Sequence, residues 1–340
     1  MTLLRTTIIA EAGVNHNGDL ALAKRLIDVA ADAGADMVKF QTFKAEMNIA
    51  EDAPKAEYQQ RNTGAAQSQL EMVRALELTE SDHDALIAHC TARGIAFLST
   101  PFDTDSIALL KRKGITIGKI PSGEITNKPY LQAMARAFPR LIISTGMCTM
   151  DEVRAALDVL LDTGADKQRI TLLHCNTEYP TPMADVHLRT MGTMREAFGV
   201  PVGYSDHTLG IEVPIAAVAL GATVIEKHIT LDRSMSGPDH RASLEPAELK
   251  AMVQAIRNIE AALGTADKQP SPSETKNIAI ARKSIHLSQP VAKGEQIAAD
   301  DLIMLRPGDG IPPMRIDEVI GMRTTRDLSK GTKLQEQDLQ

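Results

Sequence analysis

The sequence predicts an α/β protein with a (β/α)₈, or TIM, barrel over residues 1–265, a linker over residues 266–282 and a small, mostly β-stranded domain over residues 283–340. Three observations support this organisation. Short apolar segments alternate with amphipathic segments of helical length as far as about residue 265, which is typical of a parallel sheet covered by helices. The 340 residues match a barrel of about 250 residues plus a small module. Residues 265–282 begin polar and rich in proline and serine, as linkers do.

Eight apolar segments are the candidate strands of the barrel. They begin near Thr7, Met37, Ile95, Ile115, Arg140, Ile170, Val200 and Val224. Glycines stand between a helical segment and the next strand, where the chain needs a residue that tolerates positive φ. These are Gly34, Gly94, Gly114, Gly164, Gly199 and Gly221. Eight such units in about 265 residues favour a closed barrel over an open sheet.

Two further segments of the barrel have distinctive patterns. The last helix is expected to begin at Pro246 and end at Gly264, because the apolar residues between them share one face at helical spacing. Residues 43–79 form an insertion between the second strand and the helix that begins near Glu80. This insertion follows the carboxyl end of a strand, so we expect it to cover the functional site.

The carboxyl-terminal domain contains an approximate internal repeat. Residues 292–302 match residues 329–339, and each copy has a Lys-Gly pair, an apolar residue and a final Asp-Leu pair. This pattern predicts two similar halves. A domain of 58 residues has a marginal core, so we expect it to pack on a barrel of its own or a partner chain.

Composition excludes several classes of function. The net charge of −7 argues against a nucleic-acid partner, which would require a basic face. The three cysteines, Cys90, Cys148 and Cys175, show no metal-ligand spacing and are typical of a reducing compartment, so a cytoplasmic location is expected. No apolar run reaches the length of about 18 residues that a membrane helix needs, so no membrane partner is expected.

The carboxyl ends of the predicted strands are unusually polar, and this is where barrel enzymes place their working groups. These ends carry Glu11, Lys39, Gln41, Thr100, Lys119, Ser122, Glu124, Ser144, Tyr179, Ser205, His207 and His228.

Lys39 and Lys119 lie in otherwise apolar strands, where an unpaired ammonium is costly to bury. One interpretation is that each pairs with a glutamate, such as Glu11, Glu124 or Glu226. The other is that the lysines and nearby serine hydroxyls hold the phosphate and carboxylate of one small substrate, such as phosphoenolpyruvate.

His207 and His228 end two strands that are separated by one helix-length segment. Neighbouring parallel strands lie about 5 Å apart, so both imidazoles are expected to reach one divalent ion. A buried core histidine is the alternative for each. With two protein ligands, the ion would keep positions open and act as a Lewis acid on an aldehyde, while Glu11 or Glu124 orients water or transfers a proton.

Ten motifs taken in order resemble the sialic acid synthase family, the phosphoenolpyruvate-dependent N-acetylneuraminate synthases with a carboxyl-terminal antifreeze-like (SAF) domain. They are IIAEAGVNHNGD, VKFQT, LSTPFD, KIPSGE, ISTGM, LHCNTEYPTP, GYSDHT, EKHIT, GPDHRASLEP, and KGE with DDL and RPGDGI. The resemblance implies condensation of phosphoenolpyruvate with an N-acetylated aldose, N-acetylmannosamine as the first expectation, to give a nine-carbon 2-keto acid and phosphate by C–O cleavage.

The resemblance also implies roles for single residues. His207 and His228 become the ligands of Mn²⁺ or Mg²⁺, and Glu11, Glu124 and Lys119 the catalytic residues. The phosphoenolpyruvate contacts become Lys39, Thr100, Lys119, Ser122, Ser144 and Ser205. Tyr179 and Asp239 become sugar contacts. Arg306 matches an arginine that reaches a partner's barrel, which implies a domain-swapped homodimer. Some members have asparagine where this chain has Thr177, with Asn176 displaced by one.

Alternative functions stay open from the sequence. Related legionaminate and pseudaminate synthases use 2,4-diacetamido-2,4,6-trideoxyhexoses, so such a sugar is the alternative acceptor. A Schiff-base aldolase that uses Lys39, Lys119 or Lys227 is a second enzyme class, which borohydride trapping with pyruvate would reveal. A non-catalytic carbohydrate-binding protein is a third, and its signature would be sugar binding without turnover.

Overall fold

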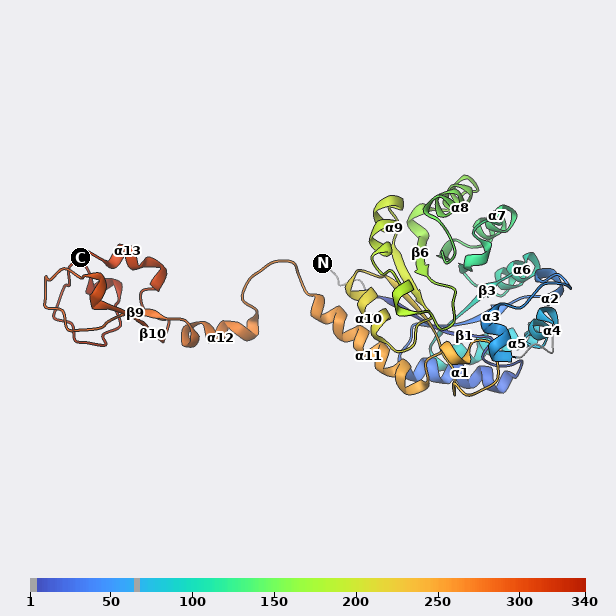
Figure 1. The fold of residues 1–340 in the computed structure, drawn as a ribbon, viewed down its shortest axis with the longest axis horizontal. Coiled ribbons are helices and arrows are strands. Elements are labelled where there is room, and N and C mark those ends of the chain that lie inside the picture. The colour runs from blue at the N-terminus through green and yellow to red at the C-terminus, as the bar shows by residue number, and fades with distance from the viewer. Residues whose placement is uncertain (1–4, 64–67) are drawn as a thin grey trace. The chain divides into compact units, whose positions relative to one another are not determined.

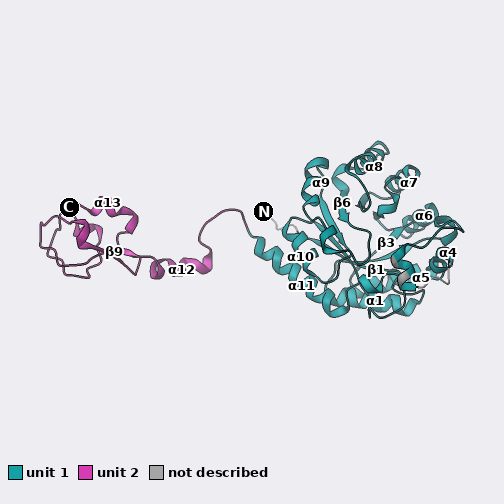
Figure 2. Cartoon of the chain, in the orientation of Figure 1, with its two compact units in different colours: residues 1–264 teal, residues 265–340 magenta. Residues whose placement is uncertain are grey.

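The structure is a computed structural model that describes residues 5–63 and 68–340. The chain forms two compact units, residues 1–264 and residues 265–340, which Figure 2 colours separately. Each unit has its own hydrophobic core. Residues 64–67 of the predicted insertion lie outside the described residues.

The first unit is built on an eight-stranded parallel sheet within the described residues (Figure 1). Its strands are β1 (Thr7–Gly13), β2 (Met37–Thr42), β3 (Ala96–Pro101), β4 (Ile117–Ile120), β5 (Arg140–Ser144), β6 (Ile170–Cys175), β7 (Val202–Asp206) and β8 (Val224–His228). Their order is β3-β2-β1-β8-β7-β6-β5-β4, and β3 also lies beside β4, so the sheet curves round into a barrel. The predicted fold class is confirmed, and every strand begins within two residues of its expected start.

Helices surround the barrel and continue into the second unit. They are α1 (Leu20–Ala33), α2 (Ala45–Asn48), α3 (Glu57–Thr63), α4 (Gln69–Arg74), α5 (Glu80–Arg93), α6 (Thr104–Arg112), α7 (Lys128–Ala137), α8 (Met150–Asp162), α9 (Thr190–Phe198), α10 (Glu212–Ala219), α11 (Pro246–Leu263), α12 (Pro272–Ala281) and α13 (Ile316–Val319). The 3₁₀ turns are η1 (Ser122–Glu124), η2 (Lys167–Arg169), η3 (Met183–Asp185), η4 (His240–Ala242), η5 (Ala299–Asp301), η6 (Pro313–Arg315) and η7 (Glu336–Asp338).

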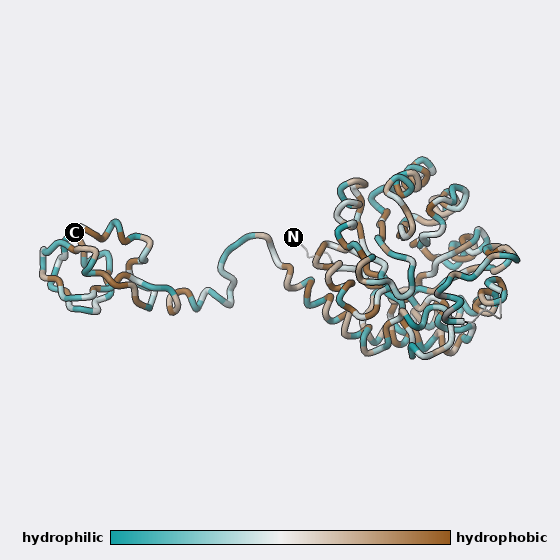
Figure 3. Tube along the Cα trace, in the orientation of Figure 1, coloured by the Kyte–Doolittle hydropathy of each residue, from teal (hydrophilic) through white to brown (hydrophobic). Residues whose placement is uncertain are grey.

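Local sequence explains where these helices begin and end. Thr79 and Thr149 cap α5 and α8 through reciprocal capping boxes. Gly34 and Gly94 end α1 and α5 in the left-handed conformation, with φ of 81° and 68°. Helix α11 runs from Pro246 as predicted, and Figure 3 shows apolar and hydrophilic residues alternating along it. Its apolar side belongs to the core that covers the sheet.

The barrel interior has an apolar end and a polar end. One buried apolar cluster fills the barrel on the side of the amino ends of the strands. It consists of Ile9, Leu98, Ile142, Leu173 and Val224. The residues that follow on the same strands are polar, among them the buried Glu11 and Thr100. Because side chains alternate along a strand, the inward positions near the carboxyl ends are therefore free to build a site.

The second unit contains a two-stranded antiparallel sheet of β9 (Ser284–Leu287) and β10 (Leu302–Leu305). The internal repeat is structural, because Gly294 and Gly331 both have positive φ, of 77° and 82°. In each copy an aspartate, Asp301 or Asp338, caps a 3₁₀ turn by accepting from a backbone N–H three residues earlier. The segment predicted as a linker is partly helical, since α12 occupies residues 272–281.

Candidate active site

The residues predicted to be functional converge on a cavity of about 760 Å³ at the carboxyl ends of the barrel strands. Its lining includes Glu11, Lys39, Gln41, Lys119, Ser122, Glu124, Ser144, Tyr179, Ser205, His207, His228 and Asp239. Thr100 lies behind this lining and accepts a hydrogen bond from Lys39. Arg306 belongs to the second unit, so its role in the site stays a prediction.

The two buried lysines are held by a network of glutamates and hydroxyls. Lys39 Nζ lies 2.9 Å from Glu11 Oε2 and 3.6 Å from Glu226 Oε1, and it donates to Thr100 Oγ1 at 2.8 Å. Lys119 Nζ donates to Ser144 Oγ at 2.6 Å and lies 3.8 Å from Glu226 Oε2. The lysines therefore do pair with glutamates. Lys119 keeps more capacity for a further anion, because only the serine lies within 3 Å of its ammonium among the described residues.

Burial and the neighbouring charges shift the pKa values of the acidic and basic groups in this network. Burial raises the pKa of Glu11 to about 7, although Lys39 opposes the shift. Burial opposes ionisation of Lys39, but Glu11 and Glu226 outweigh it and raise the pKa of the ammonium. Burial lowers the pKa of Lys119, with Glu226 opposing. Near neutral pH, Glu11 is thus able to accept or release a proton.

Glu226 is a site residue that the sequence analysis considered only as an ion-pair partner. It lines the cavity between the two lysines and accepts from Ser205 Oγ at 3.2 Å. Burial disfavours its charge, but Lys119 and Lys39 hold its pKa below the usual value. The signal was present in the sequence, because residues 226 and 228 alternate along β8 and must share the inward face.

The two histidines lie together as predicted. The ring centroids of His207 and His228 are 5.3 Å apart, and both rings are buried. Burial lowers the pKa of His207 to about 4 and that of His228 well below its usual value, so both are neutral at neutral pH. Nδ1 of His207 donates to the carbonyl of Asn176, which leaves Nε2 with a lone pair.

His228 has an unsatisfied buried nitrogen. Its Nδ1 has no hydrogen-bond partner among the described residues and lies 3.9 Å from Asp239 Oδ2. Burial raises the pKa of Asp239 to about 6. Neutral, partly unsatisfied imidazoles are suitable donors for a divalent metal ion. Within residues 5–63 and 68–340, no group of three or more His, Cys, Asp or Glu side chains is arranged to hold a metal ion.

A buried ion pair ties together the strands that carry the histidines. Lys227 Nζ donates to Asp206 Oδ2 and to the carbonyl of Thr208, and neither charged side chain is exposed. Asp206 is the last residue of β7 and directly precedes His207, and Lys227 precedes His228 on β8. Because Asp206 and Lys227 are paired in register, the ion pair fixes the relative position of the two histidines.

Tyr179 and Glu124 lie at the rim of the cavity. The Tyr179 ring lies 4.0 Å from that of His207, centroid to centroid. Glu124 accepts from Asn127 at 2.6 Å rather than pairing with a lysine, and partial burial raises its pKa. At the position where some relatives have asparagine, Thr177 lines the cavity, whereas the Asn176 side chain accepts from the backbone of Glu178.

The insertion forms one wall of the cavity. Helices α2, α3 and α4 lie within it, and its apolar contributions are Phe43, Ile49, Ala50, Ala53, Ala56, Met72, Val73 and Leu76. The expectation that the insertion covers the site is met for its described residues. No helix in the described chain is long and apolar enough to span a bilayer.

Comparison with known proteins identifies the family. Residues 26–268 match the NeuB family, and residues 282–340 match the SAF domain. The chain therefore belongs to the NeuB family of sialic acid synthases with a carboxyl-terminal SAF domain.

Two curated relatives cover nearly the whole chain, and a solved structure covers most of it. N,N'-diacetyllegionaminic acid synthase of Campylobacter jejuni is 53% identical over 98% of this chain and 99% of its own length. The Legionella pneumophila protein of the same name is 51% identical, over 96% of this chain and 92% of its own. The crystal structure of an N-acetylneuraminic acid synthetase from Leptospira borgpetersenii is 36% identical, with a TM-score of 0.72, over 81% of this chain and 91% of its own.

Proposed function

We propose that this protein is an N,N'-diacetyllegionaminate synthase, which condenses phosphoenolpyruvate with 2,4-diacetamido-2,4,6-trideoxymannose and water. The observation that carries the proposal is identity of 51–53% to two legionaminic acid synthases over almost the full length. N-Acetylmannosamine, the acceptor first expected from the sequence, is less well supported, because the compared N-acetylneuraminic acid synthetase is only 36% identical. The diacetamido sugar is therefore the better assignment.

The cavity wall supports an acceptor with additional apolar groups. Compared with N-acetylmannosamine, the diacetamido sugar has a second acetamido methyl and a methyl in place of a hydroxymethyl group. The insertion offers apolar side chains to such groups, including Phe43, Ile49 and Met72. Burial of one methyl or methylene group contributes about 0.8 kcal/mol, so two groups favour this sugar by about 1–2 kcal/mol if both contact the wall.

Phosphoenolpyruvate would bind at the polar floor. Lys119 and Ser144 are already hydrogen-bonded to each other, and Ser122 lies on the adjacent 3₁₀ turn, where its Oγ accepts from the Gly146 N–H. These groups supply donors for the phosphate and carboxylate. Lys39 contributes positive charge from beneath, since its ammonium is occupied by Glu11, Glu226 and Thr100.

His207 and His228 would hold Mn²⁺ or Mg²⁺. The neutral rings and the unsatisfied Nδ1 of His228 support this assignment. When bound, the ion supplies Lewis-acid polarisation of the acceptor aldehyde. Asp206 and Lys227 keep the rings in place, and Tyr179 packs against His207 on the cavity side.

Two glutamates supply the proton transfers. C3 of phosphoenolpyruvate forms a bond to the aldehyde carbon, a water oxygen adds to C2, and the bond between C2 and the phosphate oxygen breaks to release phosphate. Glu11, with a pKa of about 7, takes the proton that the water loses. Glu124, whose pKa is raised by burial, donates a proton to the former aldehyde oxygen. As the bond from C2 to the phosphate oxygen breaks, the C2 hydroxyl gives its proton to the departing phosphate and becomes the keto group. Glu11 then loses its proton to solvent and Glu124 regains one from it, so protons balance over one turnover.

The second unit is proposed to contribute one residue, Arg306, to the active site of a partner subunit. Arg306, together with Tyr179 and Asp239, is assigned to sugar binding, with Arg306 acting in the barrel of a partner subunit. This assignment makes the enzyme a domain-swapped homodimer. It rests on the family resemblance of the SAF domain, which matches residues 282–340.

The test is release of inorganic phosphate from phosphoenolpyruvate with Mn²⁺, run in parallel on the two candidate sugars, with and without a chelator. The proposal predicts that kcat/KM for the diacetamido sugar exceeds that for N-acetylmannosamine by about 5–30-fold, the equivalent of about 1–2 kcal/mol, and that the chelator abolishes both rates. A preference for N-acetylmannosamine would transfer the assignment to sialic acid synthesis. If phosphate is released with neither sugar, both acceptor assignments are refuted.

A further inference from the structure

A second cavity lies at the opposite end of the barrel, at the amino ends of the strands. It measures about 490 Å³, within the range of small-molecule sites. Its floor is apolar and consists of Met37, Ile117, Ile142 and Val224, from four different strands. Arg140 begins β5 and Ser144 ends it, so the cavity is about 13 Å from the active site along this strand. No step of the proposed reaction uses these residues.

The wall of this cavity is cationic. Three arginines, Arg5, Arg140 and Arg169, line it together with one acid, Glu260. Glu260 is already neutralised by Arg257, at 3.0 Å. Arg5 is held by Asp36, at 3.0 Å. These pairs leave Arg140 and Arg169 as the groups that give the cavity its positive charge, in a chain whose net charge is −7.

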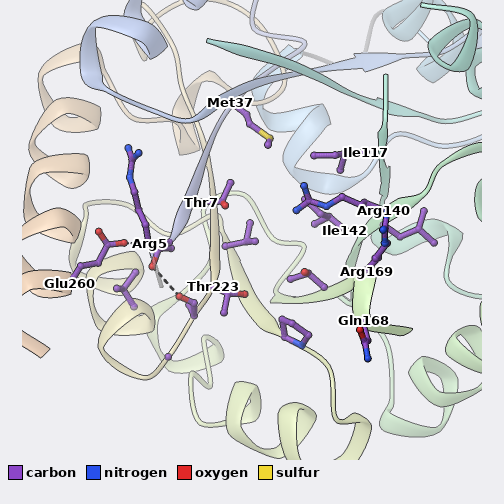
Figure 4. Close-up of a pocket in the computed structure, with 18 of the residues that line it drawn as sticks. Arg5, Thr7, Met37, Ile117, Arg140, Ile142, Gln168, Arg169, Thr223 and Glu260 are labelled. Atoms are coloured by element: carbon purple, nitrogen blue, oxygen red, sulfur yellow. Dashed lines mark hydrogen bonds between the residues drawn. The ribbon is translucent and has the colours of Figure 1, made fainter. Parts of the chain in front are cut away.

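Arg140 and Arg169 are differently engaged. The Arg140 side chain forms no hydrogen bond or ion pair with the described residues. Among the described residues, the Arg169 side chain has one ion-pair contact, of 3.5 Å with Asp166, in which both side chains are more than half exposed. Figure 4 shows the Arg140 side chain extending over the cavity beside Ile117 and Ile142, with Arg169 next to it and Arg5 on the far side.

Neutral donors stand close to this positive wall. Thr7 and Thr171 line the cavity, and their hydroxyls form no hydrogen bonds with the described residues. Gln168 adds an exposed amide at the rim. The cavity thus combines an unpaired guanidinium, free hydroxyls and an apolar floor. A ligand that satisfies all three has an anionic group at one end and an apolar portion at the other.

We propose that this cavity is a second, non-catalytic binding site for a small carboxylate with partly apolar substituents. Guanidinium groups bind carboxylates through two parallel hydrogen bonds, which suits Arg140 with support from Arg169. The ligand class includes the nine-carbon 2-keto acid that the enzyme is proposed to make, with its carboxylate, acetamido methyls and terminal methyl. Only this choice of ligand rests on the proposed function.

The experiment uses a background-free reporter, because the chain contains no tryptophan. Gln168→Trp places one at the exposed rim in the full-length enzyme, and an unchanged far-ultraviolet circular dichroism spectrum shows that the variant is folded. N,N'-diacetyllegionaminic acid is titrated without phosphoenolpyruvate or acceptor. The proposal predicts a saturable change in tryptophan fluorescence. Adding Arg140→Ala to the reporter variant should raise the dissociation constant about tenfold or more, because a charged hydrogen bond to the ligand is lost.

Two controls locate the binding. Arg112→Ala removes an exposed arginine outside the cavity and should leave the titration unchanged. Lys119→Ala, which impairs the active site, should still bind the acid in the reporter assay and by calorimetry without the reporter. No fluorescence change at millimolar acid, or equal affinity in Arg140→Ala, would overturn the site.

Inorganic phosphate is the comparison ligand. It should bind at least tenfold more weakly than the acid, because it cannot use the apolar floor. Equal affinity for phosphate would overturn the assigned ligand class. The fluorescence titration needs no turnover. If the proposed reaction is wrong, the phosphate-release assay will show it, and the fluorescence titration will still report whether the second cavity binds the acid.

Discussion

The buried pair of Lys227 and Asp206 allows a quantitative test of how the histidines are positioned. Lys227→Met removes the ammonium and keeps a side chain of similar length. Asp206 then stays fully buried with its remaining bonds to the Thr208 N–H and hydroxyl, at 3.1 and 3.0 Å. Removing one partner of such a pair costs about 3–5 kcal/mol, because the other charge loses its compensation.

We therefore expect Lys227→Met to lower the free energy of unfolding of the barrel by about 3–5 kcal/mol. Urea denaturation followed by far-ultraviolet circular dichroism measures the change. Asp206→Asn combined with Lys227→Met removes both charges and should cost less than Lys227→Met alone. Lys250→Met, at an exposed position of α11, is the matched control and should change stability by less than about 0.5 kcal/mol.

A loss below about 1 kcal/mol in Lys227→Met would refute the reasoning, since surface pairs contribute that much. The same variant should bind Mn²⁺ more weakly, because the strands that carry the two histidines lose their common tie. Unchanged metal affinity would show that the ion pair stabilises the barrel without positioning the ligands.

Three further predictions follow from the site and the core. His228→Ala should reduce turnover at least about a hundredfold and abolish Mn²⁺ binding with an unchanged circular dichroism spectrum; near-normal activity would remove the metal assignment. Burial lowers the pKa of His16 from 6.5 to about 4, so its neutral form stabilises the fold above pH 6.5. This stabilisation, about 3 kcal/mol, should be lost as the pH falls from 6.5 to 4, and His16→Gln should flatten urea-denaturation profiles over that interval; an unaltered slope would contradict it. Arg306→Ala should raise KM for the sugar more than KM for phosphoenolpyruvate, whereas equal increases would argue against a sugar contact.

The sequence was most informative about the barrel, because its repeating pattern has a direct physical cause. Glycines such as Gly34 and Gly94 stand where a helix must end in a left-handed turn, so they locate the next strand. Two strands were predicted to start at Ile115 and Val200, but they start two residues later, at Ile117 and Val202. Apolar residues alone do not define where strand pairing begins.

The features that the sequence did not predict depend either on contacts between distant segments or on local capping signals within a polar, proline-rich segment. Residues 265–282 look like a linker because they are rich in proline and serine. Even so, Ser271 and Glu274 form a capping box around Pro272, and helix α12 begins there. The arginine-lined cavity was not predicted, because Arg140 and Arg169 lie on different elements and their proximity depends on the register in which β5 and β6 pair. The spacing of residues 226 and 228 could have placed Glu226 on the inward face of β8, but its contacts with both lysines emerge only from the folded barrel.

The central claim is a condensation by C–O cleavage on the diacetamido sugar. The most direct measurement uses phosphoenolpyruvate with ¹⁸O in the oxygen that joins C2 to phosphorus, together with 2,4-diacetamido-2,4,6-trideoxymannose and Mn²⁺. Mass spectrometry of the products follows the label. The account predicts ¹⁸O in the released phosphate and none in the nine-carbon acid. Label retained in the organic product, or no condensation with this sugar, would contradict it.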